Sequence, residues 1–160
     1  MKTVLSLAFT LFSFVVAAQL QFDSAVIPPG NGSPNAIVVG DFDGNGREDV
    51  IVRLDPLGLM KAFYSNGEHD YTAKYLDITS GGPIIGFLIL AGDLNKDGKD
   101  DLVLRDPQTG KVLSCVSNGQ GFDVKSFPLN FYAPFWEGSI IDFDGDGNLD
   151  LVLVGSGAPV

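Results

Sequence analysis

The sequence predicts an all-β protein made of β-propeller blades, each with four antiparallel strands. Three observations predict this fold. First, the stretches 41-DFDGNGREDVIVR-53, 93-DLNKDGKDDLVLR-105 and 142-DFDGDGNLDLVLV-154 are close copies, spaced 52 and then 49 residues apart. Second, apolar residues between them recur with the period of two that is typical of strands. Third, 20 glycines and 9 prolines supply the turns that many short strands need.

Each repeat is expected to hold four strands in the same order. In the first repeat, strand 37–40 leads into the acidic stretch, strand 50–53 leaves it, and strands 60–64 and 71–78 follow. In the second repeat, the equivalent strands are expected at 88–91, 102–105, 112–116 and 122–127. A Ser-Asn-Gly turn follows the third strand in both, at 65–67 and 117–119. No convincing helix is expected after the N-terminal segment.

The third repeat has only its acidic stretch and the two flanking strands within this sequence. Residues 22–28 (FDSAVIP) are similar to 122–128 (FDVKSFP), so a fourth strand is expected to precede the first repeat. We therefore expect about two and a half to three blades, whereas closed propellers usually have about four to eight. Closure would then need either association of chains, with a homodimer as the hypothesis, or a missing C-terminal part.

The N-terminus has the pattern of a secretory signal. Lys2 gives a positive start, an apolar run extends from Val4 to Val16, and small residues precede a cleavage site after Ala18. The alternative, a membrane anchor, needs a longer run without the Ser and Thr residues found here. We expect residues 1–18 to be removed, and 19–160 to form a secreted, extracellular propeller region with no membrane span.

Charge and cysteine content narrow the possible functions further. The formal net charge is −10 and the pI is near 4.2, so the chain lacks the clustered basic residues with which proteins neutralise nucleic-acid phosphates. Cys115 is the only cysteine, which excludes an intrachain disulfide. Because Cys115 occupies the position of Phe63 in the first repeat, we expect it to be buried in apolar surroundings.

The three acidic stretches contain 12 of the 20 Asp and Glu residues, and ten of these are aspartates at equivalent positions. We call them loop 1 (41–49), loop 2 (93–101) and loop 3 (142–150). Side-chain oxygens recur at loop positions 1, 3, 5 and 9, a spacing of hard oxygen donors that suits Ca²⁺. Position 6 is always glycine, which permits a tight turn, and position 7 would offer its backbone carbonyl. The predicted ligands are Asp41, Asp43, Asn45, Arg47 and Asp49; Asp93, Asn95, Asp97, Lys99 and Asp101; Asp142, Asp144, Asp146, Asn148 and Asp150.

Two other interpretations, an EF-hand and a simple polar turn, fit these loops less well. An EF-hand needs a glutamate at position 12 and a helix on each side, but position 12 is Val52, Leu104 or Leu153 and each loop leads into β-forming residues. Simple polar turns would tolerate Lys, Ser or Gly at positions 1, 3, 5 and 9, and none of the copies has them. A calcium loop between two strands remains the prediction.

These residues resemble the FG-GAP or VCBS repeats, the calcium-binding blades of integrin-α-like propellers. The family pattern is Asp-x-Asp/Asn-x-Asp/Asn-Gly-x-x-Asp followed by Leu-x-Val, and all three loops match it. In 85-IGFLILAGDL-94, Gly86 and Phe87 are similar to the segment that names the family, which the other copies keep poorly. The resemblance, over about residues 20–160, implies structural calcium in each loop and an extracellular adhesion, lectin or ligand-binding role.

Catalysis finds little support, and recognition is the expected function. His69, the only histidine, lies in a polar turn, and no nucleophile motif is present. The segment 130-NFYAPFWEG-138 is rich in aromatic residues, so Tyr132 and Trp136 are candidates to bind a glycan; the alternative interpretation, slightly favoured, is packing between blades. The second expected role is a scaffold that binds an extracellular protein. Asn31, in 31-NGS-33, is a candidate glycosylation site.

Overall fold

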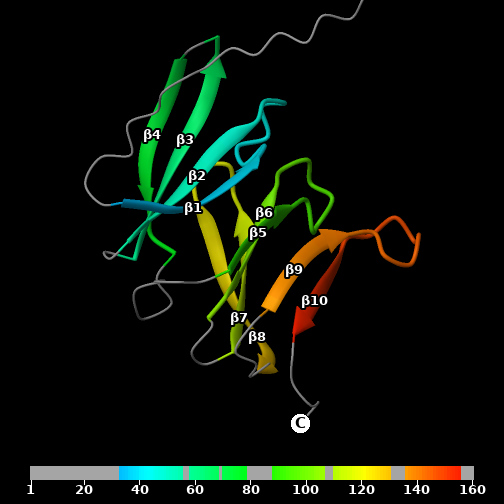
Figure 1. Cartoon of the computed structure of the whole chain (residues 1–160). Coiled ribbons are helices and arrows are strands. Elements are labelled where there is room, and N and C mark those ends of the chain that lie inside the picture. The colour runs from blue at the N-terminus through cyan, green and yellow to red at the C-terminus, as the bar shows by residue number, and fades with distance from the viewer. Residues whose placement is uncertain are drawn as a thin grey trace, which may run out of the picture.

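The computed structural model describes residues 33–55, 58–68, 70–78, 88–106, 110–130 and 136–155 (Figure 1). All regular secondary structure within these ranges is β. The strands are β1 (Ser33–Gly40), β2 (Asp49–Asp55), β3 (Leu59–Gly67), β4 (Asp70–Leu76), β5 (Leu88–Gly92), β6 (Asp101–Arg105), β7 (Lys111–Ser117), β8 (Phe122–Asn130), β9 (Trp136–Ile141) and β10 (Asp150–Gly155).

The strands form two complete four-stranded sheets and a hairpin. The first sheet has the order β1-β2-β3-β4, the second β5-β6-β7-β8, and β9 pairs with β10. Every neighbouring pair is antiparallel. The eight strands predicted for the first two repeats are confirmed, and the structure extends most of them by one or more residues. Each complete sheet has the sequential, antiparallel strand order of a propeller blade.

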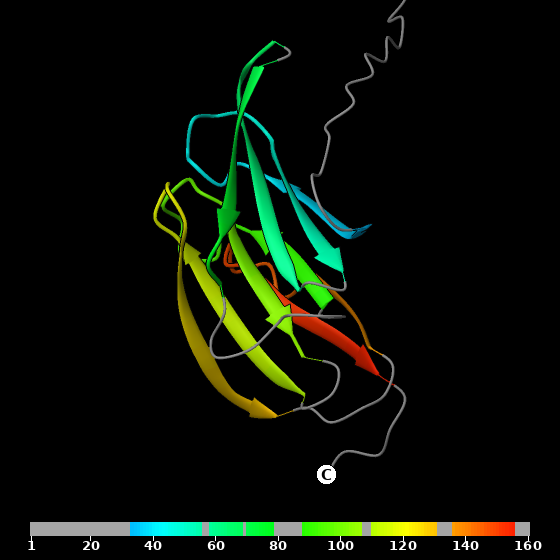
Figure 2. The same ribbon diagram turned by 90° about the vertical axis from the view of Figure 1, so that its left-hand side faces the viewer.

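The three sheets lie side by side, with the second between the other two (Figures 1 and 2). Neighbouring sheets contact one another along the first strand of each repeat, because β5 contacts both β1 and β9. The described strands do not close into a ring. The fold is therefore an open series of propeller-like blades, as the sequence predicted.

The main hydrophobic core lies between the first and second sheets. Strand alternation places Ile51, Met60 and Ala62 on the face of the first sheet that meets Leu102 and Leu113 of the second. Cys115 is fully buried in this core, as predicted, and burial raises the pKa of its thiol to about 12. The thiol is therefore a small apolar side chain at neutral pH rather than a nucleophile.

Hydrogen bonds near the loops add to this contact between sheets. The backbone N–H of Asp41 donates to the Asp100 carboxylate at 2.9 Å, and the Asp100 N–H donates back to the Asp41 carbonyl at 2.7 Å. The Ser117 hydroxyl donates to the Phe42 carbonyl. The close approach at this point requires Gly40, because a Cβ there would lie 2.5 Å from an oxygen of Asp100. The first loop is thus fixed by its own sheet and by the next.

Several sequence predictions concern residues outside the described ranges. These are the leader 1–18, the strand expected at 22–28, Asn31, His69 and Tyr132. Trp136 is described only as the first backbone position of β9. Among the described residues, no helix has the length and hydrophobicity needed to cross a membrane.

Candidate metal-binding loops

Each acidic loop joins the first two strands of its repeat. Loop 1 runs from the end of β1 to the start of β2, loop 2 from β5 to β6, and loop 3 from β9 to β10. Because antiparallel neighbours bring the two ends of each loop together, positions 1 and 9 lie next to one another at the same end of the sheet. The chain between them has to turn back within seven residues.

The turn is possible because position 6 adopts a left-handed backbone conformation. Its φ angle is 80° at Gly46, 81° at Gly98 and 84° at Gly147. An L-residue with a Cβ atom rarely adopts these angles, whereas glycine does so at little cost. The glycine predicted from the loop pattern is therefore required by the backbone itself.

The same internal hydrogen bonds recur in all three loops. In loop 1, the Asp41 carboxylate accepts the N–H of Gly46 at 2.7 Å, and the Asp43 carboxylate accepts the N–H of Asn45 at 3.0 Å. The Asn45 side-chain oxygen then accepts the N–H of Arg47 at 2.9 Å. Loops 2 and 3 repeat these bonds, from position 6 to 1, from 5 to 3 and from 7 to 5. The backbone thus fixes the orientation of each donor side chain.

Position 9 ties the loop to the sheet. In loop 1, the buried Asp49 carboxylate accepts the N–H of Phe42 at 3.0 Å and the N–H of Ser65, on β3, at 2.7 Å. Asp101 of loop 2 makes the equivalent bonds to Leu94, at 3.2 Å, and to Ser117, at 2.8 Å. Sequence reasoning missed this role of the serine, although its recurrence sixteen residues after position 9 in both repeats was the available signal.

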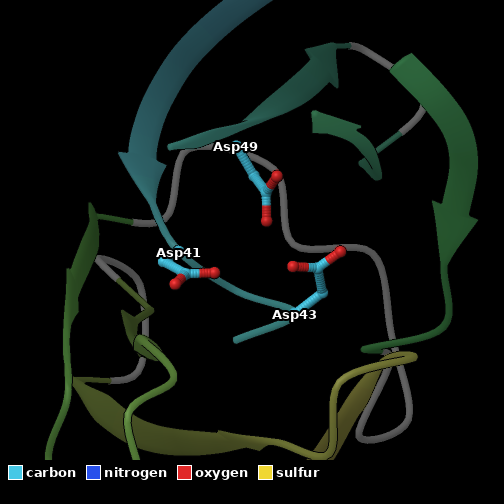
Figure 3. A group of neighbouring side chains, drawn as sticks. All are labelled: Asp41, Asp43 and Asp49. Carbon is cyan, nitrogen blue, oxygen red and sulfur yellow. The ribbon is translucent and has the colours of Figure 1, made fainter. Parts of the chain in front are cut away.

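Carboxylates converge in loops 1 and 3. Oxygens of Asp41, Asp43 and Asp49 lie within 4.8 Å of one another, and so do oxygens of Asp142, Asp144 and Asp146. Figure 3 shows the three side chains of loop 1 pointing toward a shared centre from both ends of the loop. Negative oxygens at this separation repel one another unless a cation lies between them. Oxygen donors are the type of ligand that hard divalent cations such as Ca²⁺ prefer.

Loop 2 has the same backbone but a different charge arrangement. Its third position is Asn95, whose amide donates to Asp97 at 3.2 Å, and the Lys99 ammonium pairs with the Asp97 carboxylate at 2.8 Å. The hydrogen bond from the Lys99 side chain holds the pKa of Asp97 below its usual value. Asp97 would have to turn from Lys99 toward the loop centre to bind a cation there.

Burial acts on the position 9 carboxylates. It raises the pKa of Asp49 and of Asp101, while the hydrogen bonds from Ser65 and Ser117 act in the opposite direction. Neighbouring carboxylates of the same loop raise both values further. A cation at the loop centre would favour the charged carboxylates, and so it would offset the rise in pKa that burial and the neighbouring carboxylates cause.

A small hollow lies between the first sheet and the Ser-Asn-Gly turn of the second. Its volume is about 280 Å³. The Lys74 ammonium crosses between the sheets and donates to the Gln120 carbonyl at 2.6 Å. Sequence reasoning did not find this hollow, because its lining residues come from two different repeats and only the fold brings them together. The hollow is lined by Asp43, Tyr64, Asn66, Thr72, Lys74, Gly119 and Gln120.

The fold and loops define the class: an all-β protein of propeller-like blades with an Asp-rich loop between the first two strands of each. Comparison with known families agrees, because residues 93–153 match the family described as FG-GAP-like repeat. The matched segment includes loops 2 and 3. Loop 1 lies before the matched segment and shares its sequence pattern and its hydrogen bonds. No curated protein and no solved structure matches the chain significantly.

Proposed function

We propose that the chain is a secreted, calcium-stabilised binding module in which each acidic loop holds one Ca²⁺. The observation that carries the proposal is the convergence of carboxylate oxygens in loops 1 and 3, on a backbone that loop 2 shares. Repeats of this family are generally binding or structural modules, which supports a role without catalysis. The leader-like segment 1–18 supports secretion.

The ligands would come from positions 1, 3, 5 and 9, with the backbone carbonyl of position 7. In loop 1 these are Asp41, Asp43, Asn45, Asp49 and the carbonyl of Arg47. Bound calcium supplies positive charge between groups that otherwise repel, and it links the end of one strand to the start of the next. Affinity of about 10⁻⁴ to 10⁻³ M, as in other extracellular calcium modules, would be sufficient outside the cell.

Thermal unfolding with and without calcium tests the proposal. A cation that binds only the folded chain raises the melting temperature, and at a calcium concentration 10 times the Kd the gain is about 1.4 kcal/mol per site. We expect EDTA to lower the melting temperature and millimolar CaCl₂ to restore it. The double variant Asp41→Asn with Asp142→Asn, at the position that is aspartate in all three loops, is expected to lose the part of this calcium response that loops 1 and 3 contribute.

The matched control is Asp123→Asn, which makes the same chemical change at an exposed position on β8, outside the loops. It is expected to keep the full response to calcium. An identical melting curve for the wild type in EDTA and in calcium would contradict the proposal, and so would an equal loss of response in Asp123→Asn.

For the ligand, we propose a glycan. Two features support it: the aromatic segment that ends in Trp136 at the start of β9, and the hollow beside loop 1 with its hydroxyl, amide and charged groups. Sugars are bound by aromatic faces and by polar groups that match their hydroxyls. The second candidate is an extracellular protein partner, for which exposed aromatic residues are also suited.

A glycan array separates these candidates and the two locations. We expect a specific signal that Trp136→Ala abolishes if the aromatic segment binds the sugar. Loss of signal in Asn66→Ala but not in Trp136→Ala would instead place binding in the hollow. Saturating protein without any glycan signal would contradict the lectin role and favour the protein partner.

A further inference from the structure

The face of the first sheet that is turned away from the second sheet exposes apolar side chains. We call it the outer face of the first sheet. The exposed fraction is 67% for Ile37 and 52% for Val39 on β1, and 38% for Tyr71 and 49% for Tyr75 on β4. These exposed residues lie on the two edge strands of the sheet, and they flank Val52 and Phe63, which are already buried on the same face. An apolar face with exposed margins of this kind can accept a partner.

The equivalent face of the second sheet is an interface within this same molecule. Register places Ile89 opposite Leu104 as Ile37 lies opposite Val52, and Phe122 opposite Ser117 as Tyr71 lies opposite Ser65. Ile89 and Phe122 pack against the core shared with the first sheet. The outer face of the first sheet therefore has the residue pattern of a surface on which another blade docks.

The hairpin β9–β10 offers the complementary surface. Phe143 occupies loop position 2, as Phe42 does in loop 1, yet Phe143 is 73% exposed and Phe42 is fully buried. Phe42 is buried because the second sheet covers it, and its ring contacts Phe122 edge to face with the centroids 5.9 Å apart. Ile141 and Val154, on the same side of the hairpin, are 41% and 66% exposed. Within the described ranges, no blade covers this side of the hairpin as the second sheet covers the equivalent side of the first sheet.

We propose that a second copy of the chain covers these surfaces, with the hairpin β9–β10 of one copy docked head to tail on the outer face of the first sheet of the other. Phe143 then packs on Tyr71 of the other copy, as Phe42 packs on Phe122. Ser65 stands where Ser117 does, with its hydroxyl available for the Phe143 carbonyl. Both surfaces are present on every copy, so the contact is heterologous and can be closed by two chains.

At one position, the proposed contact between copies differs from the contact between the first and second sheets of one chain. Ile141 stands where Gly40 and Gly92 permit close approach of the next sheet. The paired backbone bonds of Asp41 and Asp100 are therefore not expected between copies, and side-chain packing of Ile141, Phe143 and Val154 replaces them. The proposal does not depend on calcium as the loop ligand, so it is tested in both calcium and EDTA.

The mass in solution tests the contact. We expect light scattering to give twice the chain mass at tens of micromolar, falling toward one chain mass on dilution. Phe143→Glu places a charge in the docked surface and is expected to weaken association at least tenfold. Because Phe143 is exposed within one chain, the circular dichroism spectrum of this variant should not change. Ser126→Glu, which adds the same charge at an exposed position on β8, is the control.

Cross-linking tests the geometry. Phe143→Cys and Tyr71→Cys are purified separately and treated with a short bismaleimide, alone and mixed; the buried Cys115 does not react. We expect covalent dimers mainly in the mixture. A wild type that stays monomeric at all concentrations would overturn the proposal. Equal cross-linking of either variant alone would overturn it too, because it would mean that like surfaces of the two copies meet each other. Unchanged association in Phe143→Glu would overturn it as well.

Discussion

The carboxylate at position 9 shows how single residues connect the loops to the fold. Asp49 has no exposed surface, and its two oxygens each accept a backbone N–H, from Phe42 and from Ser65. The sequence predicted Asp49 only as a metal ligand. Its second role, holding β3 against the start of the loop, depends on a serine sixteen residues away and becomes visible only in the folded chain.

Asp49→Asn tests this second role. The amide keeps one acceptor oxygen but presents an N–H₂ group to a buried N–H donor, so we expect a loss of about 1 to 3 kcal/mol in the free energy of unfolding. Urea unfolding in EDTA measures it without any contribution from calcium. Asp43→Asn, at a less buried position of the same loop, serves as the control and is expected to change stability in EDTA by less than about 0.5 kcal/mol. Equal stability of the two variants would contradict the assignment.

Gly46→Ala tests the backbone requirement at position 6. A Cβ at Gly46 would meet no atom within 4 Å, so any cost arises from its φ of 80° alone. We expect a loss of about 1 to 2 kcal/mol in the free energy of unfolding. Gly121→Ala also meets open space and has no such φ, and is expected to be nearly neutral. A neutral Gly46→Ala would show that the turn can relax.

At the scale of elements, the strands could be predicted from the sequence, whereas the contacts between one sheet and the next could not. Alternating apolar residues and the fifty-residue repeat located all eight strands of the first two repeats, because both signals are local. The contact between sheets instead depends on particular side chains, such as Asp100, whose equivalents are Glu48 and Leu149. No repeat pattern marks Asp100, and only the structure shows that it joins loop 1 to the second sheet.

Phe42 and Phe143 both occupy loop position 2, but Phe42 is buried and Phe143 is exposed. The variants Phe42→Ala and Phe143→Ala therefore compare the same position in a covered loop and in an uncovered one. Phe42 is buried between two sheets, so its truncation should destabilise the chain by about 3 to 5 kcal/mol. Phe143 is exposed within one chain, so its truncation should change the unfolding free energy by less than about 0.5 kcal/mol when measured at concentrations where the chain is monomeric. Chemical denaturation at low protein concentration measures both. Similar losses would mean that Phe143 is buried within its own chain.

At the scale of the whole molecule, negative charge opposes folding and the loops concentrate it. The net charge is −10, and 12 of the 20 acidic residues lie in three nine-residue loops at the ends of the sheets. Unlike charges spread over a surface, these cannot move apart without breaking the hydrogen bonds that recur in every loop. The sequence indicated the need for cations, and the structure adds the fixed orientation of the donor groups.

Ionic strength therefore has a predictable effect on stability. In EDTA, added NaCl should raise the urea midpoint, because it screens repulsion among carboxylates a few ångströms apart. In saturating calcium the same salt should have a smaller effect, since each bound Ca²⁺ already offsets two negative charges of its loop. A urea midpoint in EDTA that does not change between low and high salt would contradict this description of the loops.

Crystals grown in millimolar calcium and measured at a long wavelength test the central claim most directly. The account predicts three anomalous difference peaks, one in each loop, each surrounded by the oxygens of positions 1, 3, 5, 7 and 9 at about 2.3 to 2.6 Å. The absence of an anomalous peak from all three loops, in well-ordered electron density at that calcium concentration, would contradict it.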